Sequence, residues 1–426
     1  MFNLSFLSPV SQELSEKLNS EDPNLSEILL DQSCLRALQL LDLTLNVNEN
    51  NHQLSAKAFS VLTSGNDKIF ASILEDNAKR LNDCLDDVFT TKDPIKLNRI
   101  AKIIQSCFVQ PNDLNDGRGF DRILDFLNYC DFRSVFDLFC SIIEYDGGTL
   151  PIQDDIHQKL ASQIVGIIKN TPTDLTDDRQ ILLLTNLFKL ISLIQDHPLF
   201  EDQLTPDDFQ SLLLYEFTGA STSLLNAKWA AICSVESTMS FSGIIAENIK
   251  YVLDKLEKIE KFMPYHETIL LLIGKVATVE LTVAVKLKEE HFGKKLAELV
   301  RAFPKHSNIH IAVVEYYKKI HEVENLNNDI LESLLPVVID FIKEDASVEM
   351  RSFAWNLSSV VMEQNNEIKL EEKLGGDAWK KIEEIKKTVD TPYGGDLPQQ
   401  EENEPGSDLS SAQIQLLLRF LMANSQ

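Results

Sequence analysis

Residues 94–108 read PIKLNRIAKIIQSCF, and this stretch decides the fold class. Its large apolar side chains recur three and four residues apart, at Ile100, Ile103 and Ile104, so they share one face of an α-helix. Asp93 stands in front as an N-cap, and the proline that opens the stretch suits the first helical position. The stretch therefore predicts an amphipathic helix that must pack against other helices.

The same apolar spacing recurs along most of the chain, for example in Leu183–Ile194 and Ile245–Ile259. Only 15 Gly and 14 Pro occur in 426 residues, fewer than turn-rich β folds need. Helix-breaking clusters separate blocks of roughly 30 to 45 residues, the length of a helix pair in repeat proteins. We therefore expect an all-α fold, a right-handed α-solenoid of HEAT/armadillo-like helical repeats.

The stretch Val279–Leu287 departs from this spacing, because apolar and other residues alternate as they do in a β-strand. From the residues alone, this stretch is compatible with either a helix or a strand. We favour helix, since a lone strand among helices would leave its backbone groups without hydrogen-bond partners.

Three regions are expected along the chain. Residues 1–387 form the helical array, which is clearest in 1–320. Residues 388–409 are rich in Glu, Pro and Gly, a composition typical of an acidic flexible linker. Residues 410–426 carry an apolar stripe and are predicted to form an amphipathic helix that docks on the array or binds a partner.

The composition excludes several function classes. The formal net charge of -26 opposes binding to nucleic acid and to anionic membranes. The first nine residues lack the pattern of a secretory signal, and no apolar run is long enough to span a membrane. Six cysteines without CxxC spacing indicate reduced thiols, so we expect a cytoplasmic protein, with the nucleus as a second compartment.

No phosphate-binding loop, nucleophile elbow or metal-ligand motif occurs in the sequence. His306 and His310 are the only closely spaced histidines, and we interpret them as a loop residue and a helix-start residue. Asp154 and Asp155 before His157 are typical of the acidic first turn of a helix, with a catalytic cluster as the alternative. We therefore expect no catalytic residue, cofactor or metal, and a protein that binds other proteins.

Short segments in a fixed order resemble the SAPS family, the regulatory subunits of serine/threonine protein phosphatase six. The resemblance covers roughly Met1–Ile320. The segments that carry it are LSEILLD at Leu25–Asp31, AFSVLT at Ala58–Thr63, KLNRIAKI at Lys96–Ile103, SVFDLFCSII at Ser134–Ile143, DIHQ at Asp155–Gln158, and Phe303–Pro304 followed by Ile309–His310.

This resemblance implies a non-catalytic scaffold that binds a phosphatase catalytic subunit and directs it to substrates. Asn98, Arg99, Arg133 and Asp137 lie in or beside the family-like helices and are the candidate partner-binding residues, with Trp379 added as an aromatic residue on a charged helix. Solvated faces or hydrogen bonds between repeats are the alternative roles. The rival function is an acidic armadillo/HEAT adaptor for basic or transport cargo.

Overall fold

The computed structural model is all-α, and it describes residues 12–20, 33–47, 51–64, 78–108, 122–144, 154–195, 204–235, 239–257, 259–343, 345–364 and 370–390. Within these ranges no strand forms, and a single parallel bridge joins Asp174 to Thr218. The expected all-α fold is confirmed for the described residues. The chain divides into two compact units, Met1–Leu334 and Leu335–Gln426. The array that we expected through residue 387 therefore extends over both units.

The helix expected from residue 94 is present as α7, Pro94–Phe108. The Asp93 carboxylate accepts hydrogen bonds from the backbone N–H groups of Ile95 at 2.8 Å and Lys96 at 3.4 Å. Ile100, Ile103 and Ile104 are all buried, because they form the face that packs on neighbouring helices. The N-cap and the apolar stripe therefore have the roles that the sequence predicts.

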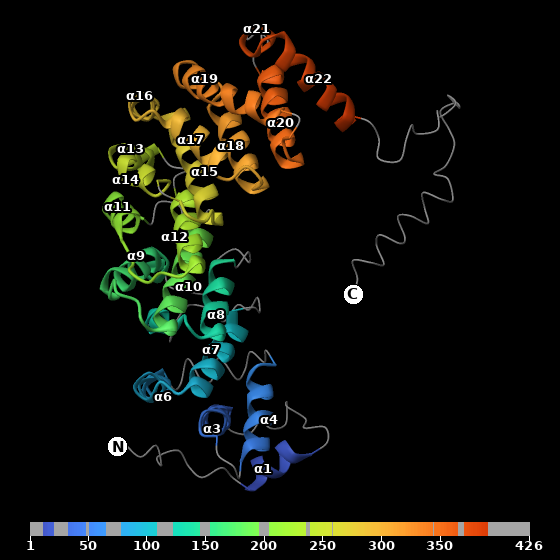
Figure 1. Ribbon diagram of the computed structural model, residues 1–426. Coiled ribbons are helices and arrows are strands. Elements are labelled where there is room, and N and C mark those ends of the chain that lie inside the picture. The colour runs from blue at the N-terminus through green and yellow to red at the C-terminus, as the bar shows by residue number, and fades with distance from the viewer. Residues whose placement is uncertain are drawn as a thin grey trace, which may run out of the picture. The chain divides into compact units, whose positions relative to one another are not determined.

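One set of helices in the first unit packs one against the next (Figure 1), and we call this set the stacked layer. Each of its members contacts the following one. Its members are α7, α8 (Arg133–Ile143), α10 (Asp178–Gln195), α12 (Thr222–Val235), α15 (Pro264–Val279) and α18 (Ser307–Ile320).

A second set of helices packs beside the stacked layer, and we call it the covering layer (Figure 1). Its members are α9 (Asp154–Asn170), α11 (Pro206–Leu214), α13 (Met239–Glu247), α14 (Ile249–Asp254), α16 (Leu281–Glu289) and α17 (Phe292–Ala302). The unit also contains α1 (Gln12–Asn19), α3 (Ser33–Leu45), α4 (His52–Leu62), α6 (Ala78–Thr91) and the 3-10 helix η1 (Ile123–Tyr129).

The core of this unit lies between the two layers and between stacked helices. Trp229 retains only 2% of its accessible surface and lies in this core. Phe188 packs edge-on against Phe217 at 6.1 Å, and Phe292 packs edge-on against Tyr316 at 5.5 Å. Apolar burial of this kind is the main stabilising term in such a helical array.

The apolar stripe at Ile245–Ile259 does not form the one helix that its spacing predicts. The chain breaks at Asn248 into α13 and α14, and α14 ends at Asp254. The Asn248 side chain donates to the carbonyl oxygen of Ile244 at 2.9 Å. Asn side chains compete in this way for backbone groups, which is why the periodicity alone predicted a helix that is too long.

The alternating stretch Val279–Leu287 is helical, as we favoured. Glu280 adopts an extended conformation with φ -110° and ψ 97°, and it separates α15 from α16. Val283 and Leu287 are buried, whereas Leu281 and Val285 face solvent. The alternation therefore arises from two apolar stripes on opposite sides of one helix.

The second unit contains the end of α19 (Glu324–Phe341) together with α20 (Val348–Gln364), α21 (Leu370–Leu374) and α22 (Gly376–Asp390). Phe341 and Phe353 pack edge-on at 5.8 Å, and Leu357 and Ile382 are buried. Because α22 runs to Asp390, it includes the first three residues of the expected linker. The rest of that linker and the predicted helix at 410–426 lie outside the described residues.

Candidate protein-interaction surface

The outward side of α12 carries no charged side chain. Its exposed and half-exposed residues are small or uncharged, and they include Ser223, Asn226, Ala230 and Cys233. The only charged residue in this helix is Lys228, which is buried. An uncharged helix face is unusual in a chain in which 25% of residues are charged, and depletion of charge is typical of the core of protein interfaces.

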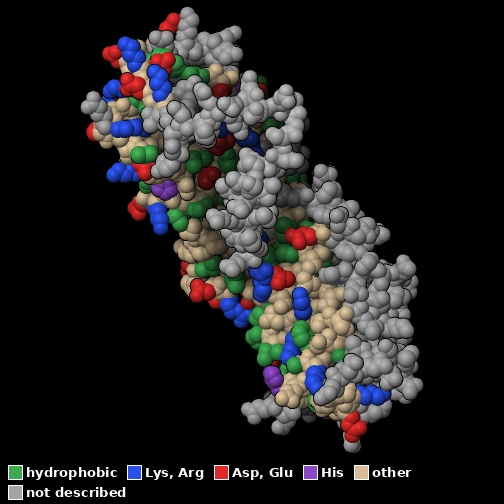
Figure 2. Space-filling model, turned by 90° about the vertical axis from the view of Figure 1, so that its right-hand side faces the viewer, with side chains coloured by type: hydrophobic (Ala, Val, Ile, Leu, Met, Phe, Trp, Pro, Cys, Tyr) green, Lys and Arg blue, Asp and Glu red, His purple; other side chains and the backbone are tan. Residues whose placement is uncertain are grey.

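The neighbouring helices α10 and α15 continue this surface with apolar residues and lysines. Leu182 on α10 is 46% exposed, and Lys189 lies on the same helix. Leu271 and Lys275 are half-exposed on α15. Figure 2 shows the molecule from the side on which the stacked layer lies in Figure 1. On this side, hydrophobic and basic side chains lie between acidic ones. We call the outward side of α10, α12 and α15 the stacked face.

Among the candidate partner-binding residues, Arg99 forms hydrogen bonds to other residues of the first unit. Its guanidinium donates to the carbonyl oxygen of Thr44 at 2.8 Å and to the hydroxyl of Ser55 at 2.5 Å, and it lies 5.3 Å from the Phe59 ring centroid. Burial lowers the pKa of Arg99. Arg99 therefore has the alternative role given for these residues, because its hydrogen bonds join neighbouring helices.

Asn98, Arg133 and Asp137 lie nearer to solvent. The Asn98 amide donates to the carbonyl oxygen of Pro94 at 2.8 Å, within its own helix. Arg133 and Asp137 form an ion pair at 2.8 Å on α8, and Arg133 is 83% exposed. The backbone oxygen of Asp137 also accepts from the Gln105 side chain at 3.2 Å, which links α7 to α8.

Trp379 is half-exposed on α22 and belongs to the second unit. It is therefore no part of the stacked face. Trp355 on α20 is half-exposed as well, whereas its neighbours Phe353 and Ala354 are buried.

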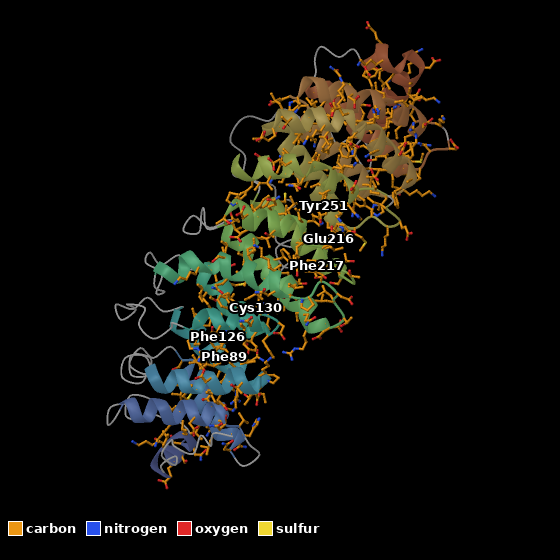
Figure 3. The ribbon with its side chains drawn as sticks, turned by 90° about the vertical axis from the view of Figure 1, so that its left-hand side faces the viewer. Phe89, Phe126, Cys130, Glu216, Phe217 and Tyr251 are labelled. Atoms are coloured by element: carbon orange, nitrogen blue, oxygen red, sulfur yellow. The ribbon has the colours of Figure 1, made fainter. Side chains whose placement is uncertain are left out.

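Sequence reasoning missed a group of ionisable side chains around Lys228. The Lys228 ammonium donates to the carbonyl oxygen of Tyr215 at 2.6 Å, and burial lowers its pKa to about 8. Glu216 and Tyr251 lie close to each other (Figure 3), and Glu216 accepts hydrogen bonds from Lys255 and Tyr251. Burial alone would raise the pKa of Glu216, but these hydrogen bonds lower it. The sequence feature that could have revealed this group is a single lysine, Lys228, in an otherwise uncharged helix.

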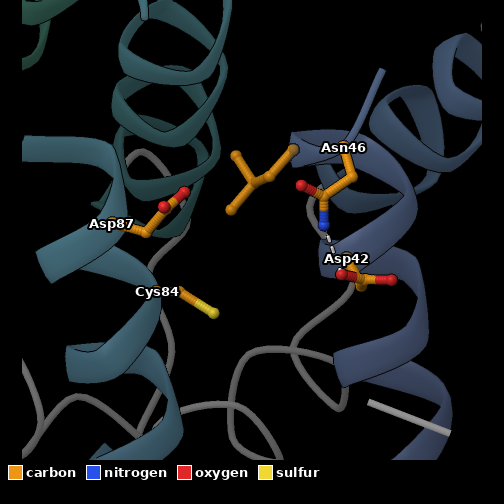
Figure 4. A pocket seen from close by; sticks show the side chains of 5 residues that line it. Asp42, Asn46, Cys84 and Asp87 are labelled. Carbon is orange, nitrogen blue, oxygen red and sulfur yellow. Dashed lines mark hydrogen bonds between the residues drawn. The ribbon is translucent and has the colours of Figure 1, made fainter. Parts of the chain in front are cut away.

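A small polar pocket lies between α3 and α6 (Figure 4). It is lined by Asp42, Asn46, Cys84 and Asp87 together with Leu45, and its cavity volume is about 10 Å³. Burial raises the pKa of Asp42. This volume holds about one water molecule and lies far below the roughly 300–1,000 Å³ of typical small-molecule sites.

The predicted histidines occupy helix ends. His306 stands in front of α18 and His310 lies inside it, which confirms our interpretation of this pair. Asp154, Asp155 and His157 all fall in the first turns of α9. Across the described ranges, no group of three or more His, Cys, Asp or Glu side chains is arranged to hold a metal ion, and no helix is long and apolar enough to cross a membrane.

Comparison with known proteins adds no family to these observations. No family model matches the sequence, and no curated protein matches it.

Proposed function

We propose that this protein is a non-catalytic scaffold whose partner binds the stacked face. One observation carries the proposal: the outward side of α12 is uncharged and is bordered by Leu182 and Leu271. Burying charged side chains in an interface costs desolvation energy, so an uncharged centre with apolar neighbours suits a protein partner.

The proposed partner is the catalytic subunit of a serine/threonine protein phosphatase. Short sequence segments that occur in a fixed order between Met1 and Ile320 resemble the SAPS family. This resemblance supports the proposed partner. In this proposal the phosphatase supplies all the chemistry, and the helical array directs it to substrates. Many modest contacts over several stacked helices add up to a stable complex.

An acidic adaptor for basic cargo is the competing proposal. It would require the acidic residues to gather where the cargo binds. The stacked face instead carries both signs of charge: Lys189 and Lys275 lie on it, and so does Glu267, one turn before Leu271 on α15. This mixture of charges around the uncharged side of α12 favours the scaffold.

The test is affinity purification of the tagged full chain from its own cells, with mass spectrometry and a phosphatase assay on the eluate. Ala230→Glu places a charge at the centre of the stacked face, and we expect it to reduce co-purified phosphatase at least tenfold. Thr282→Glu on α16 is the matched control, because Thr282 is also exposed but lies in the covering layer.

Phosphatase retained by both variants would move the binding site away from the stacked face. An eluate without phosphatase but rich in basic or transport proteins would replace the scaffold proposal with the adaptor.

A further inference from the structure

Lys228 is a buried cation that is held by neutral acceptors. It retains 2% of its accessible surface. Its ammonium donates to the carbonyl oxygen of Tyr215 at 2.6 Å and lies 3.5 Å from the hydroxyl oxygen of Tyr251. It also lies 5.4 Å from the Trp229 ring centroid. A carbonyl, a phenol and an aromatic ring compensate the loss of hydration less fully than a bound carboxylate does.

The loop between α11 and α12, which we call the 215–219 loop, supplies the carbonyl oxygen of Tyr215 that Lys228 binds. It is fastened to the turn between α9 and α10 by two backbone hydrogen bonds. Leu175 N–H donates to Thr218 O at 3.0 Å, and Thr218 N–H donates to Thr173 O at 2.8 Å. Gly219 has φ +76°, and a Cβ there would meet the Leu175 carbonyl oxygen at 2.8 Å. The 215–219 loop therefore packs directly against the turn between α9 and α10.

The charges that act on Lys228 come from this loop and from the residue that follows α14. Glu216 in the loop favours the ammonium form, and Lys255, directly after α14, opposes it. Glu216 is engaged by Lys255 and by the hydroxyl of Tyr251, and Figure 3 shows Glu216 and Tyr251 next to each other. The Glu216 carboxylate therefore compensates Lys228 from a distance, without a direct hydrogen bond.

We propose that the 215–219 loop opens to hydrate the Lys228 ammonium, so that opening is favoured when Lys228 is protonated and suppressed when it is neutral. In the closed state the pKa of Lys228 is about 8, and in water it returns to its ordinary value of 10.5. Opening therefore takes up a proton between these values, and the open population falls as pH rises through this window.

Hydrogen exchange of the Leu175 and Thr218 amides, measured on the full chain from pH 7 to pH 9.5, tests this proposal. After correction for the intrinsic exchange rate of unfolded peptides, we expect the opening constant of both amides to fall roughly 25-fold across this range. At each pH, both amides should have larger opening constants than the slowest amides of α7, which separates opening of the loop from global unfolding. The variant Lys228→Met, similar in length but never charged, should give opening constants that do not change with pH.

Opening constants of wild-type Leu175 and Thr218 that stay constant with pH would overturn the proposal, and so would an equal fall in Lys228→Met. If the variant does not fold, the comparison between these two amides and those of α7 in the wild-type chain decides the question alone.

Discussion

The Arg99 guanidinium on α7 lies 2.8 Å from the backbone oxygen of Thr44, a residue 55 positions earlier in α3. The same side chain reaches Ser55 on α4, so one residue joins three helices. A planar guanidinium with several fixed donors can make both bonds at once, which an ammonium on a lysine stem does poorly. Arg99 is therefore a structural tie.

Replacing Arg99 by lysine tests this role. We expect Arg99→Lys to lower the free energy of unfolding by about 1–3 kcal/mol, because the Thr44 carbonyl or the Ser55 hydroxyl loses its donor. Denaturant unfolding followed by circular dichroism measures the change. The control is Arg133→Lys, which alters an exposed ion pair and should stay within about 0.5 kcal/mol of wild type. Equal stability of the two variants would show that Arg99 contributes no more than a surface arginine.

Gly293 marks a close contact between α17 and α19. A Cβ at this position would lie 2.7 Å from the Ser333 hydroxyl oxygen and 3.0 Å from the Asp329 backbone oxygen. Because a backbone atom cannot move aside without shifting the helix, we expect Gly293→Ala to destabilise the protein by about 1–3 kcal/mol. Gly243→Ala is the matched helical control, since a Cβ there meets nothing within 4 Å. Its expected effect is neutral or stabilising by up to about 1 kcal/mol. The melting temperatures of the two variants should therefore move in different directions.

The burial of Lys228 predicts a pH dependence of global stability. Its pKa is about 8 in the folded chain and 10.5 for the ordinary side chain, so the unfolded state binds more protons between these values. Stability should therefore rise with pH across this window. Relative to Lys228→Met, wild type should gain about 3 kcal/mol between pH 7 and pH 10.5, the free energy that corresponds to this difference in pKa. Urea titrations of both proteins at several pH values measure the gain, and parallel curves would contradict it.

The burial of His266 predicts that the stability of the protein depends on pH in the acid range. Burial lowers its pKa to about 4, and its Nδ1 accepts a hydrogen bond from the Met263 N–H at 2.9 Å. The unfolded chain takes up a proton near pH 6.5 that the folded chain refuses, so stability should fall as pH decreases from 6.5 to 4. His266→Gln keeps an acceptor for Met263 without a titrating group and should show a smaller fall. The unfolding midpoints of wild type and His266→Gln should be measured from pH 7 to pH 4. As pH falls, the midpoint of the variant should rise relative to that of wild type.

Much of the fold could be predicted because helix formation depends on local spacing. The stripe at Ile100, Ile103 and Ile104 fixed the buried face of α7, and Asp93 fixed its start. The break at Asn248 could not be predicted, because the side chain of an asparagine either faces solvent or takes a backbone carbonyl, and the local pattern is the same in both cases.

By itself the sequence determined the helical class and the absence of familiar catalytic motifs, since both depend on residues that are close along the chain. Only the tertiary structure decided that Lys228 is buried, that Arg99 ties three helices together, and that α12 presents an uncharged side to solvent. The physical reason is that burial and charge compensation depend on which helix faces are covered. That covering is set by contacts between residues tens of positions apart, which a local pattern of side chains does not specify.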